Sequence, residues 1–189
     1  DYKDVPEVIS KALKGEKVVL YGHQELIDID KLPRHISGFG ASSYLKIAEG
    51  CDNRCSYCII PALRGRYRSR KTEDILEEAK ELSRNGIKEV NVIAQDITRY
   101  GLDLYKSRQL SELLKKLAEI NGIEWIRLLY SYPDEFNDEL IEVIAREDKI
   151  CKYLDIPIQH ASNRILKKMG RRSSREQILR LIEKLRKRI

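Results

Sequence analysis

Short apolar runs alternate with helical patterns along the chain from Gly40 onward, and this rhythm constrains the fold more than any other feature. The runs cover residues 44–48, 89–94, 125–130 and 153–158 and are rich in β-branched, aromatic and leucine side chains. Runs of this kind are typical of strands buried on both faces of a parallel sheet. Because crossovers between parallel strands are right-handed, the order β-α-β-α-β-α-β-α predicts a parallel sheet with helices outside it.

The segments between these runs carry signals for helix starts. Ser173 is followed three residues later by Glu176, which is the spacing of a capping box before a helix. The other predicted caps are Ser, Thr or Asn residues, which accept hydrogen bonds from the first helical N–H groups. The predicted helices begin after Thr72, Ser111, Asn137 and Ser173.

Four β-α units fit two architectures, an open doubly wound sheet and a (β/α) barrel. After the fourth predicted strand the chain stops in a charged helix. Four strands cannot close a barrel, since closed barrels of this kind need about eight. We therefore expect a partial, TIM-like (β/α) barrel that is truncated, and we expect the chain to be a piece of a longer protein.

Residues 1–37 precede this rhythm. An amphipathic helix is predicted over residues 5–13, ending at Gly15, and a short strand over residues 17–21. Residues 25–37 have no clear period and contain a proline, which predicts a linker.

Basic residues are concentrated at the end of the chain. The 36 Lys and Arg residues outnumber the 30 Asp and Glu residues, for a formal net charge of +6. Residues 161–189 hold 11 basic and 2 acidic residues, so the first 160 residues carry a balance of −3. A protein that binds nucleic acid with its whole surface would not show this distribution. No apolar run approaches the ~20 residues of a membrane helix and no signal peptide opens the chain, so we expect a cytoplasmic protein without a membrane partner.

Three of the four cysteines, Cys51, Cys55 and Cys58, directly follow the first predicted strand. Parallel α/β folds build their sites at this end of the strands, and Gly50 gives the chain freedom to turn there. A structural zinc site takes four closed ligands, whereas a [4Fe–4S] cluster can take three cysteines and leave one iron open. The pattern favours the cluster, and a zinc-bound structural or interaction module is the alternative. Cys151, much further along, is predicted to be a small core residue.

The spacing Cys-x-x-x-Cys-x-x-Cys, with Tyr57 before the last cysteine, resembles the signature of the radical S-adenosylmethionine (radical SAM) enzymes. The resemblance implies a partial barrel of the radical SAM type. It also implies a [4Fe–4S] cluster on Cys51, Cys55 and Cys58, whose open iron chelates S-adenosylmethionine. One-electron reduction then yields a 5′-deoxyadenosyl radical. By the same resemblance, Tyr57 is expected to lie against the adenine.

The surrounding residues, from 44 to 172, resemble the methylthiotransferases within that family, notably the stretches 45–61 and 64–70. One branch modifies a tRNA adenosine, and the other modifies an aspartate of ribosomal protein S12. Two stretches resemble the S12 branch. They are Ala94-Gln95-Asp96-Ile97-Thr98-Arg99-Tyr100-Gly101 and Leu154-Asp155-Ile156-Pro157-Ile158-Gln159-His160-Ala161-Ser162.

Two glutamines in these stretches are candidate cofactor-binding residues by the same resemblance. Gln95 is expected near the methionine carboxylate and amine, and Gln159 near the ribose hydroxyls, because an amide can both donate and accept hydrogen bonds. Loop hydrogen bonding without ligand contact is the alternative for each. The chain lacks the Gly-Gly-Glu that many radical enzymes carry after the second strand. No residue is assigned a catalytic role, and the roles of Asp96 and His160 stay open.

The implied activity is the addition of a methylthio group to the β-carbon of an aspartate in ribosomal protein S12, on the ribosome or free. A tRNA adenosine is the alternative substrate. In the family a second [4Fe–4S] cluster in an N-terminal domain carries the sulfur, so a sulfur donor and an electron donor are implied partners. Residues 1–37 are expected to be the tail of that domain plus a linker, and residues 38–189 an incomplete radical SAM core.

Six basic residues lie on or after the cysteine loop, at Arg54 and within residues 64–71. They are expected either to contact an acidic protein or RNA surface near the mouth of the site, or to form a solvated face.

Overall fold

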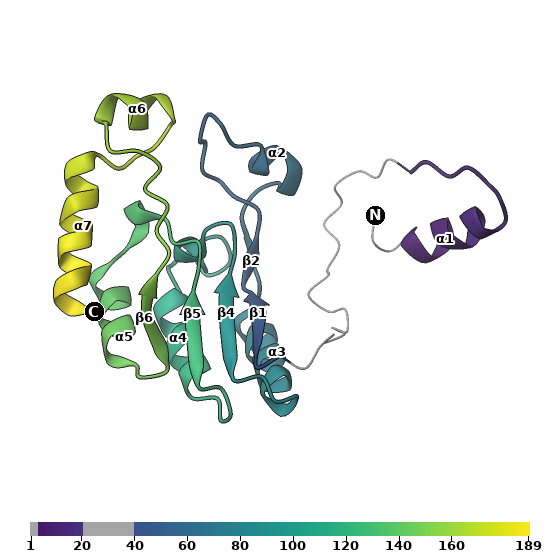
Figure 1. Ribbon diagram of the computed structural model, residues 1–189, viewed down its shortest axis with the longest axis horizontal. Helices are drawn as coiled ribbons and strands as arrows, with labels where there is room; N and C mark the ends of the chain where they lie inside the picture. Colours follow the sequence, from purple (N-terminus) through teal and green to yellow (C-terminus); the bar gives the residue numbers. More distant parts are fainter. Residues whose placement is uncertain (1–3, 21–39) are drawn as a thin grey trace. The chain divides into compact units, whose positions relative to one another are not determined.

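The computed structural model describes residues 4–20 and 40–189, and the chain divides into two compact units, Asp1–Arg34 and His35–Ile189. In the first unit, helix α1 (Val5–Leu13) forms where it was predicted (Figure 1). The predicted strand is wrong over residues 17–20, which are irregular and belong to neither sheet of the described residues. A strand without a partner leaves its backbone groups to water and is not stable alone. Residue 21 and the predicted linker lie outside the described residues.

The second unit is built on four parallel strands in the order β1-β4-β5-β6 (Figure 1). Their bounds are β1 (Ser42–Lys46), β4 (Glu89–Ile93), β5 (Trp125–Leu128) and β6 (Ile150–Leu154). The parallel α/β prediction is therefore confirmed. The strand order follows the chain order without reversal, so the sheet lacks the switch point of a doubly wound fold.

Three amphipathic helices cover one face of this sheet: α3 (Thr72–Arg84), α4 (Leu110–Ala118) and α5 (Asp138–Arg146). Alternate strand residues and the apolar helix faces share one core. Its members include Leu45, Val90, Val92, Ile126 and Leu128 from the strands and Leu82, Leu114, Leu117 and Ile144 from the helices. All these crossover helices lie on one face and the strand order is unreversed, which is the arrangement of a (β/α) barrel segment.

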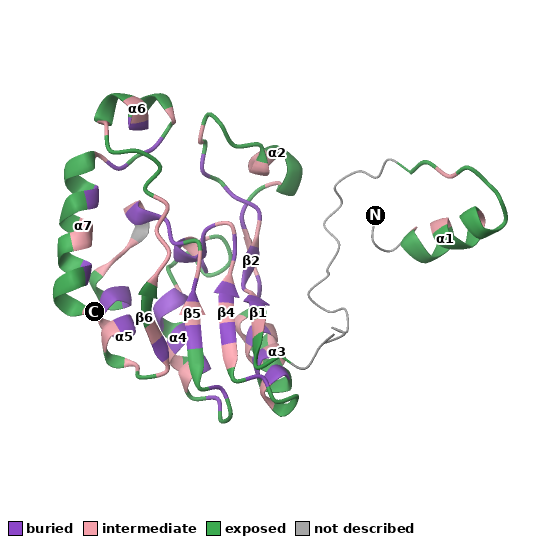
Figure 2. Ribbon diagram, in the orientation of Figure 1, coloured by how far each residue is buried: buried purple, intermediate pink, exposed green. Residues whose placement is uncertain are grey.

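The opposite face of the sheet is only half-buried, which corrects the expectation of burial on both faces. Buried and half-buried residues alternate along β4 (Figure 2). Polar and aromatic side chains occupy this second face: Arg127 pairs with Glu89 at 2.6 Å and lies 5.5 Å from the ring centroid of Tyr153, while Tyr44 and Trp125 are more than half exposed. In a barrel segment this face is the inner one, and it alternates with the helix-covered face because side chains alternate along a strand.

The fourth strand lies three residues earlier than predicted, over Ile150–Leu154 instead of 153–158. Pro157 has no N–H to donate to a ladder, which disfavours a strand through it. Asp155 instead holds the end of β5, since its Oδ2 accepts from Tyr130 N at 3.1 Å and its carbonyl accepts from Ser131 N at 3.0 Å. The apolar run after Leu154 therefore becomes a loop at the edge of the sheet.

Among the described residues, two α-helices start with side-chain caps. Asn137 caps α5 as predicted, accepting from Leu140 N at 2.8 Å. Helix α7 (Arg175–Arg188) starts with a capping box between Ser174 and Gln177, one residue later than predicted. The other predicted caps, Thr72 and Ser111, lie within two residues of the actual positions, Lys71 and Gln109.

The short elements are β2 (Ala48–Glu49), α2 (Ile60–Arg64), β3 (Arg68–Ser69), η3 (Ile97–Arg99), η4 (Pro133–Glu135) and α6 (Asn163–Lys168). Helices α2 and α6 lie beyond the same end of the sheet (Figure 1). Among the described residues, no helix has the length and apolar character to cross a membrane.

Leu114 on α4 tests the importance of the covered face. Replacing this fully buried side chain (Leu114→Ala) should lower the free energy of unfolding by about 2–5 kcal/mol, because it leaves a cavity between helix and sheet. Leu179→Ala, on a side chain 48% exposed on α7, should cost less than about 1 kcal/mol. Urea unfolding followed by circular dichroism measures both, and equal losses would contradict the assigned core.

Candidate functional site

The carboxyl ends of the four parallel strands meet at one edge of the sheet, and the segments that leave them carry the candidate residues. The cysteine loop follows β1 and β2, Gln95 follows β4, Ser131 follows β5 and Gln159 follows β6. Active sites of (β/α) folds are built at this edge. The structure therefore places the cysteines and both glutamines at one end of the molecule.

The cysteine loop is closed at its base by a short ladder. Strands β2 and β3 pair antiparallel, and Cys51 N donates to Gly65 O at 3.2 Å. Gly50 starts the loop with φ +81°, and a Cβ there would lie 2.1 Å from Arg66 O. Only glycine tolerates both the left-handed backbone and this approach. The ladder and Gly50 together make residues 51–65 a pinched loop rather than an open excursion.

The three thiols of this loop differ in their surroundings. Cys51 is buried, its Sγ accepts from Asn53 N at 3.4 Å, and burial raises the pKa of its thiol. Cys55 is half-buried, and its Sγ lies 4.0 Å from both Tyr132 Oη and Arg171 Nη1. Cys58 is exposed, with its backbone N donating to Cys55 O at 3.0 Å.

As the loop stands, these thiols do not form a closed ligand set. Among the residues that the structure describes, no group of three or more His, Cys, Asp or Glu side chains is arranged to hold a metal ion. Cys51 Sγ and Cys55 Sγ each have polar neighbours within 4.0 Å, whereas Cys58 is exposed. A hollow of about 360 Å³ lies beside Cys51 and is also lined by Asn53, Arg54 and Arg66.

Cys151 takes no part in this loop. It lies on β6 and is half-buried rather than in the core, which corrects the sequence expectation. Burial raises the pKa of its thiol, and the nearby Arg127 opposes that effect. Its surroundings are those of the inner sheet face, where Arg127 pairs with Glu89.

Asp96, whose role the sequence left open, anchors the loop to the end of β4. Its fully buried carboxylate accepts from Asn53 Nδ2 at 3.1 Å and from the hydroxyl and N–H of Thr98. Tyr67 donates its hydroxyl to Asp96 O at 2.9 Å, and its N–H donates to Asp52 Oδ1 at 3.2 Å. Burial raises the pKa of Asp96, and the bonds from Thr98 and Asn53 oppose that rise. Sequence reasoning missed Asn53 and Tyr67, because neither forms part of the cysteine spacing.

Two buried polar atoms at this edge lack partners among the described residues: Gln95 Oε1 and Ser131 Oγ. Gln95 Nε2 reaches Glu49 Oε1 at 3.4 Å, which leaves the carbonyl end of the amide unsatisfied. Buried polar atoms are normally paired, so such atoms require an explanation, and a ligand is one. Gln159 is exposed but has φ +67°, a strained backbone for a non-glycine residue.

Two further candidates lie in loops at this edge. Tyr57 is 51% exposed on the cysteine loop; burial and the Cys55 thiol raise the pKa of its phenol, and the Arg171 guanidinium opposes that rise. His160 is exposed, and its Nδ1 accepts from Ser162 N at 2.9 Å, which is a local turn contact. The described contact of the His160 ring is therefore a hydrogen bond from the backbone of its own loop.

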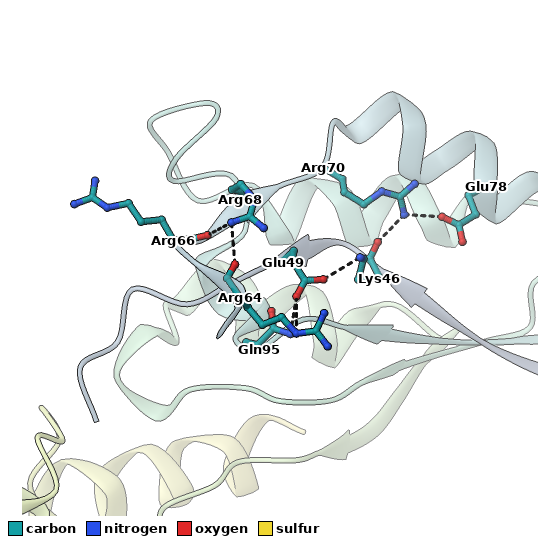
Figure 3. A network of polar contacts seen from close by, with 8 residues as sticks. All are labelled: Lys46, Glu49, Arg64, Arg66, Arg68, Arg70, Glu78 and Gln95. Carbon is teal, nitrogen blue, oxygen red and sulfur yellow. Dashed lines mark hydrogen bonds and ion pairs between the residues drawn. The ribbon is translucent and has the colours of Figure 1, made fainter. Parts of the chain in front are cut away.

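The arginines after the cysteine loop do not form one patch (Figure 3). Arg70 is buried and bonds Glu78 at 2.5 Å and Lys46 O at 2.7 Å. Arg68 folds back onto the carbonyls of Arg64 and Arg66, at 3.0 and 2.7 Å. The Arg66 side chain is exposed and extends away from the network, so it is the member of this group free to meet a partner.

Gly50 offers a test of the pinched loop. Gly50→Ala should lower the free energy of unfolding by more than about 2 kcal/mol, because the methyl group meets the Arg66 carbonyl in addition to the left-handed strain. Gly86→Ala is the matched control, since its φ is +84° but nothing lies within 4 Å of an added Cβ. It should cost only about 1–2 kcal/mol. Thermal unfolding measures both variants. Equal losses of unfolding free energy would show that the loop accommodates the added methyl group without cost.

Comparison with known proteins identifies the family of this chain. The radical SAM superfamily matches residues 45–189. A protein of Caldanaerobacter subterraneus named ribosomal protein uS12 methylthiotransferase RimO is 52% identical over 98% of this chain and 43% of its own length. Relatives of the same name from Lachnoclostridium phytofermentans and Clostridioides difficile are 54% and 50% identical over the whole chain. The chain spans about 43% of the length of these relatives.

Solved structures agree in fold. The radical S-adenosylmethionine methyltransferase TsrM of Kitasatospora setae superposes with a TM-score of 0.60 at 21% identity, over 78% of this chain and 28% of its own. The cobalamin-dependent radical enzyme OxsB gives a TM-score of 0.54 at 18% identity, over 75% of this chain and 22% of its own. Both likenesses support the partial barrel. With the family match over residues 45–189, they confirm the resemblance drawn from the cysteine spacing: the chain belongs to the radical SAM superfamily.

Proposed function

We propose that this chain is the radical SAM core of a methylthiotransferase that modifies an aspartate of ribosomal protein S12. The observation that carries the proposal is an identity of 50–54% with proteins named for that activity, extending over at least 98% of the chain. The relatives are more than twice as long as this chain, so the complete reaction is proposed for the whole protein. A tRNA adenosine is the competing substrate, and a reaction that contains both S12 and tRNA separates the two possibilities.

Cys51, Cys55 and Cys58 are proposed to hold a [4Fe–4S] cluster. The donor set fits, because thiolates are the ligands of such clusters and one loop carries all three cysteines. Asn53, tied to Asp96, fixes the backbone beside Cys51. When bound, the cluster supplies one electron to S-adenosylmethionine, which yields the 5′-deoxyadenosyl radical. The chain's own part is to keep the loop pinched at Gly50 and to leave one position of the cluster open.

S-adenosylmethionine is proposed to bind along the carboxyl ends of β4, β5 and β6. Gln95 Oε1 and Ser131 Oγ are buried acceptors without partners among the described residues, and a ligand amine or hydroxyl would satisfy them. Gln159 is proposed to meet the ribose, and Tyr57 to cover the adenine by an inward rotation from its exposed position. The chain then holds the reacting carbon of the substrate close to the 5′ position and excludes water.

Residues 1–37 are proposed to be the tail of an N-terminal domain with a linker, and residues 38–189 the radical SAM core. That N-terminal domain would hold a second [4Fe–4S] cluster that carries the sulfur. A sulfur donor and an electron donor complete the proposed partners, and the setting is the cytoplasm, on the ribosome or beside it.

The cysteine assignment is tested by cluster uptake. After anaerobic reconstitution of the chain, Cys51→Ala, Cys55→Ala and Cys58→Ala should each lose most of the bound iron and sulfide. Cys151→Ala is the matched control and should keep them, because Cys151 lies on β6 away from the loop. Iron and sulfide analysis with electron paramagnetic resonance (EPR) gives the result. Zinc in place of iron in the wild-type protein would favour an interaction module.

The Gln95 assignment is tested by cofactor affinity. Gln95→Ala should keep the cluster but weaken S-adenosylmethionine binding about 5- to 20-fold, the value of one or two lost hydrogen bonds. Gln109→Ala removes a half-buried amide whose Nε2 donates to Ser107 Oγ within its own loop, and it should leave the affinity unchanged. Equilibrium dialysis measures both, and an unchanged affinity in Gln95→Ala would mean that this amide serves the loop alone.

The substrate is tested with the full-length protein that contains this chain. Incubation with S-adenosylmethionine, a reductant and a sulfur source should add a methylthio group to S12 and leave tRNA unchanged. Mass spectrometry of both substrates from one reaction gives the answer. Modified tRNA with unmodified S12 would overturn the S12 assignment while leaving the reaction class intact.

A further inference from the structure

The turn after α6 lies on the cysteine loop, although more than 110 residues separate the two along the chain. Ser56 donates its N–H to Met169 O and its hydroxyl to Lys168 O, both at 3.0 Å. Gly170 has φ +70°, and a Cβ there would lie 2.6 Å from Arg54 O. The backbone of this turn therefore packs directly against the backbone of the loop, with no room for a side chain at Gly170.

Arg171 extends from this turn toward Cys55. The arginine is only 8% exposed, its Nη2 donates to Pro157 O at 2.9 Å, and its Nη1 lies 4.0 Å from Cys55 Sγ. Its guanidinium carbon lies 3.9 Å from the ring centroid of Tyr132. The hydroxyl of Tyr132 reaches the same sulfur at 4.0 Å. A stacked guanidinium and a phenol thus converge on one thiol.

The charge of Arg171 lacks an ordinary counter-charge. Among the described residues no carboxylate lies within ion-pair distance of it, and its neighbours are the Pro157 carbonyl, the ring of Tyr132, the Tyr57 hydroxyl and the Cys55 thiol. A buried charge is costly unless it is paired. Cys55 Sγ, as a ligand of the cluster, would place negative charge 4.0 Å from Arg171 Nη1.

We propose that Arg171, stacked on Tyr132, is a positioning residue. It holds Cys55 Sγ in place and keeps a positive charge beside that ligand of the cluster. The inference rests on the proposed function only in that Cys55 ligates the cluster. Its consequence is electrostatic. Reduction adds an electron to the cluster, and a fixed positive charge beside one ligand favours the reduced state. Arg171 should therefore raise the reduction potential.

The test is a redox titration of the reconstituted full-length protein, monitored by EPR. Arg171→Gln removes the charge and keeps a polar side chain, although a shorter one. It should shift the one-electron reduction equilibrium of the core cluster about tenfold toward the oxidised state, a fall of ~59 mV. Arg171→Lys keeps the charge and should recover most of that shift. Arg175→Gln, the control, removes an exposed arginine four residues later and should leave the potential unchanged.

Variants that fold but take up the cluster poorly are also informative. If Arg171→Gln loads little iron while Arg171→Lys loads normally, the charge beside Cys55 is required, and the proposal is supported. If both fail alike, or if Arg171→Gln loads fully with the wild-type potential, Arg171 serves packing alone and the proposal is overturned. Failure of the cluster assignment looks different, because the wild-type protein itself would then bind no cluster at these cysteines, and failure of the S12 assignment alone would leave the cluster and its potential unchanged.

Discussion

Burial of one face of the parallel sheet under α3, α4 and α5 is the constraint on which the rest of the structure depends. The core between helices and sheet takes every second residue of β4 and β5, together with Leu45 of β1. That alternation fixes the strand register, because a slip of one residue would turn the apolar side chains to the other face. With the register fixed, the four strands end at one edge, and Gln95, Ser131 and the cysteine loop are brought there together.

The cysteine loop adds a second level of order on that edge. Its base is pinched by the β2–β3 ladder, its first half is tied to Asp96 through Asn53, and its middle is held by the turn after α6. These ties restrict Cys51 and Cys55 but leave Cys58 exposed. A loop restricted in this way loses less conformational entropy on binding a cluster than an unstructured loop does. The exposed Cys58 thiol remains accessible from solvent.

Sequence patterns predicted the parts of this fold that local physics decides. Strands β4 and β5 start where the apolar runs start. Asn137 caps α5 because its side-chain oxygen accepts a hydrogen bond from a first-turn N–H group that has no partner within the helix. The prediction failed where neighbours decide. The run after Leu154 reads as a strand, but Pro157 and the bonds of Asp155 to β5 make it a loop. Residues 17–20 have strand composition but no partner strand among the described residues.

The same distinction applies to charge. A count of basic residues treats Arg66, Arg68, Arg70 and Arg171 alike, but their surroundings give them four different roles. Arg66 faces solvent, Arg68 braces the backbone of the loop, and Arg70 forms an ion pair in the protein interior. Arg171 is buried against an aromatic ring and a thiol, over one hundred residues from that thiol in sequence. No spacing rule connects residues 55 and 171, so tertiary packing alone shows that a basic residue of the C-terminal surplus lies beside Cys55.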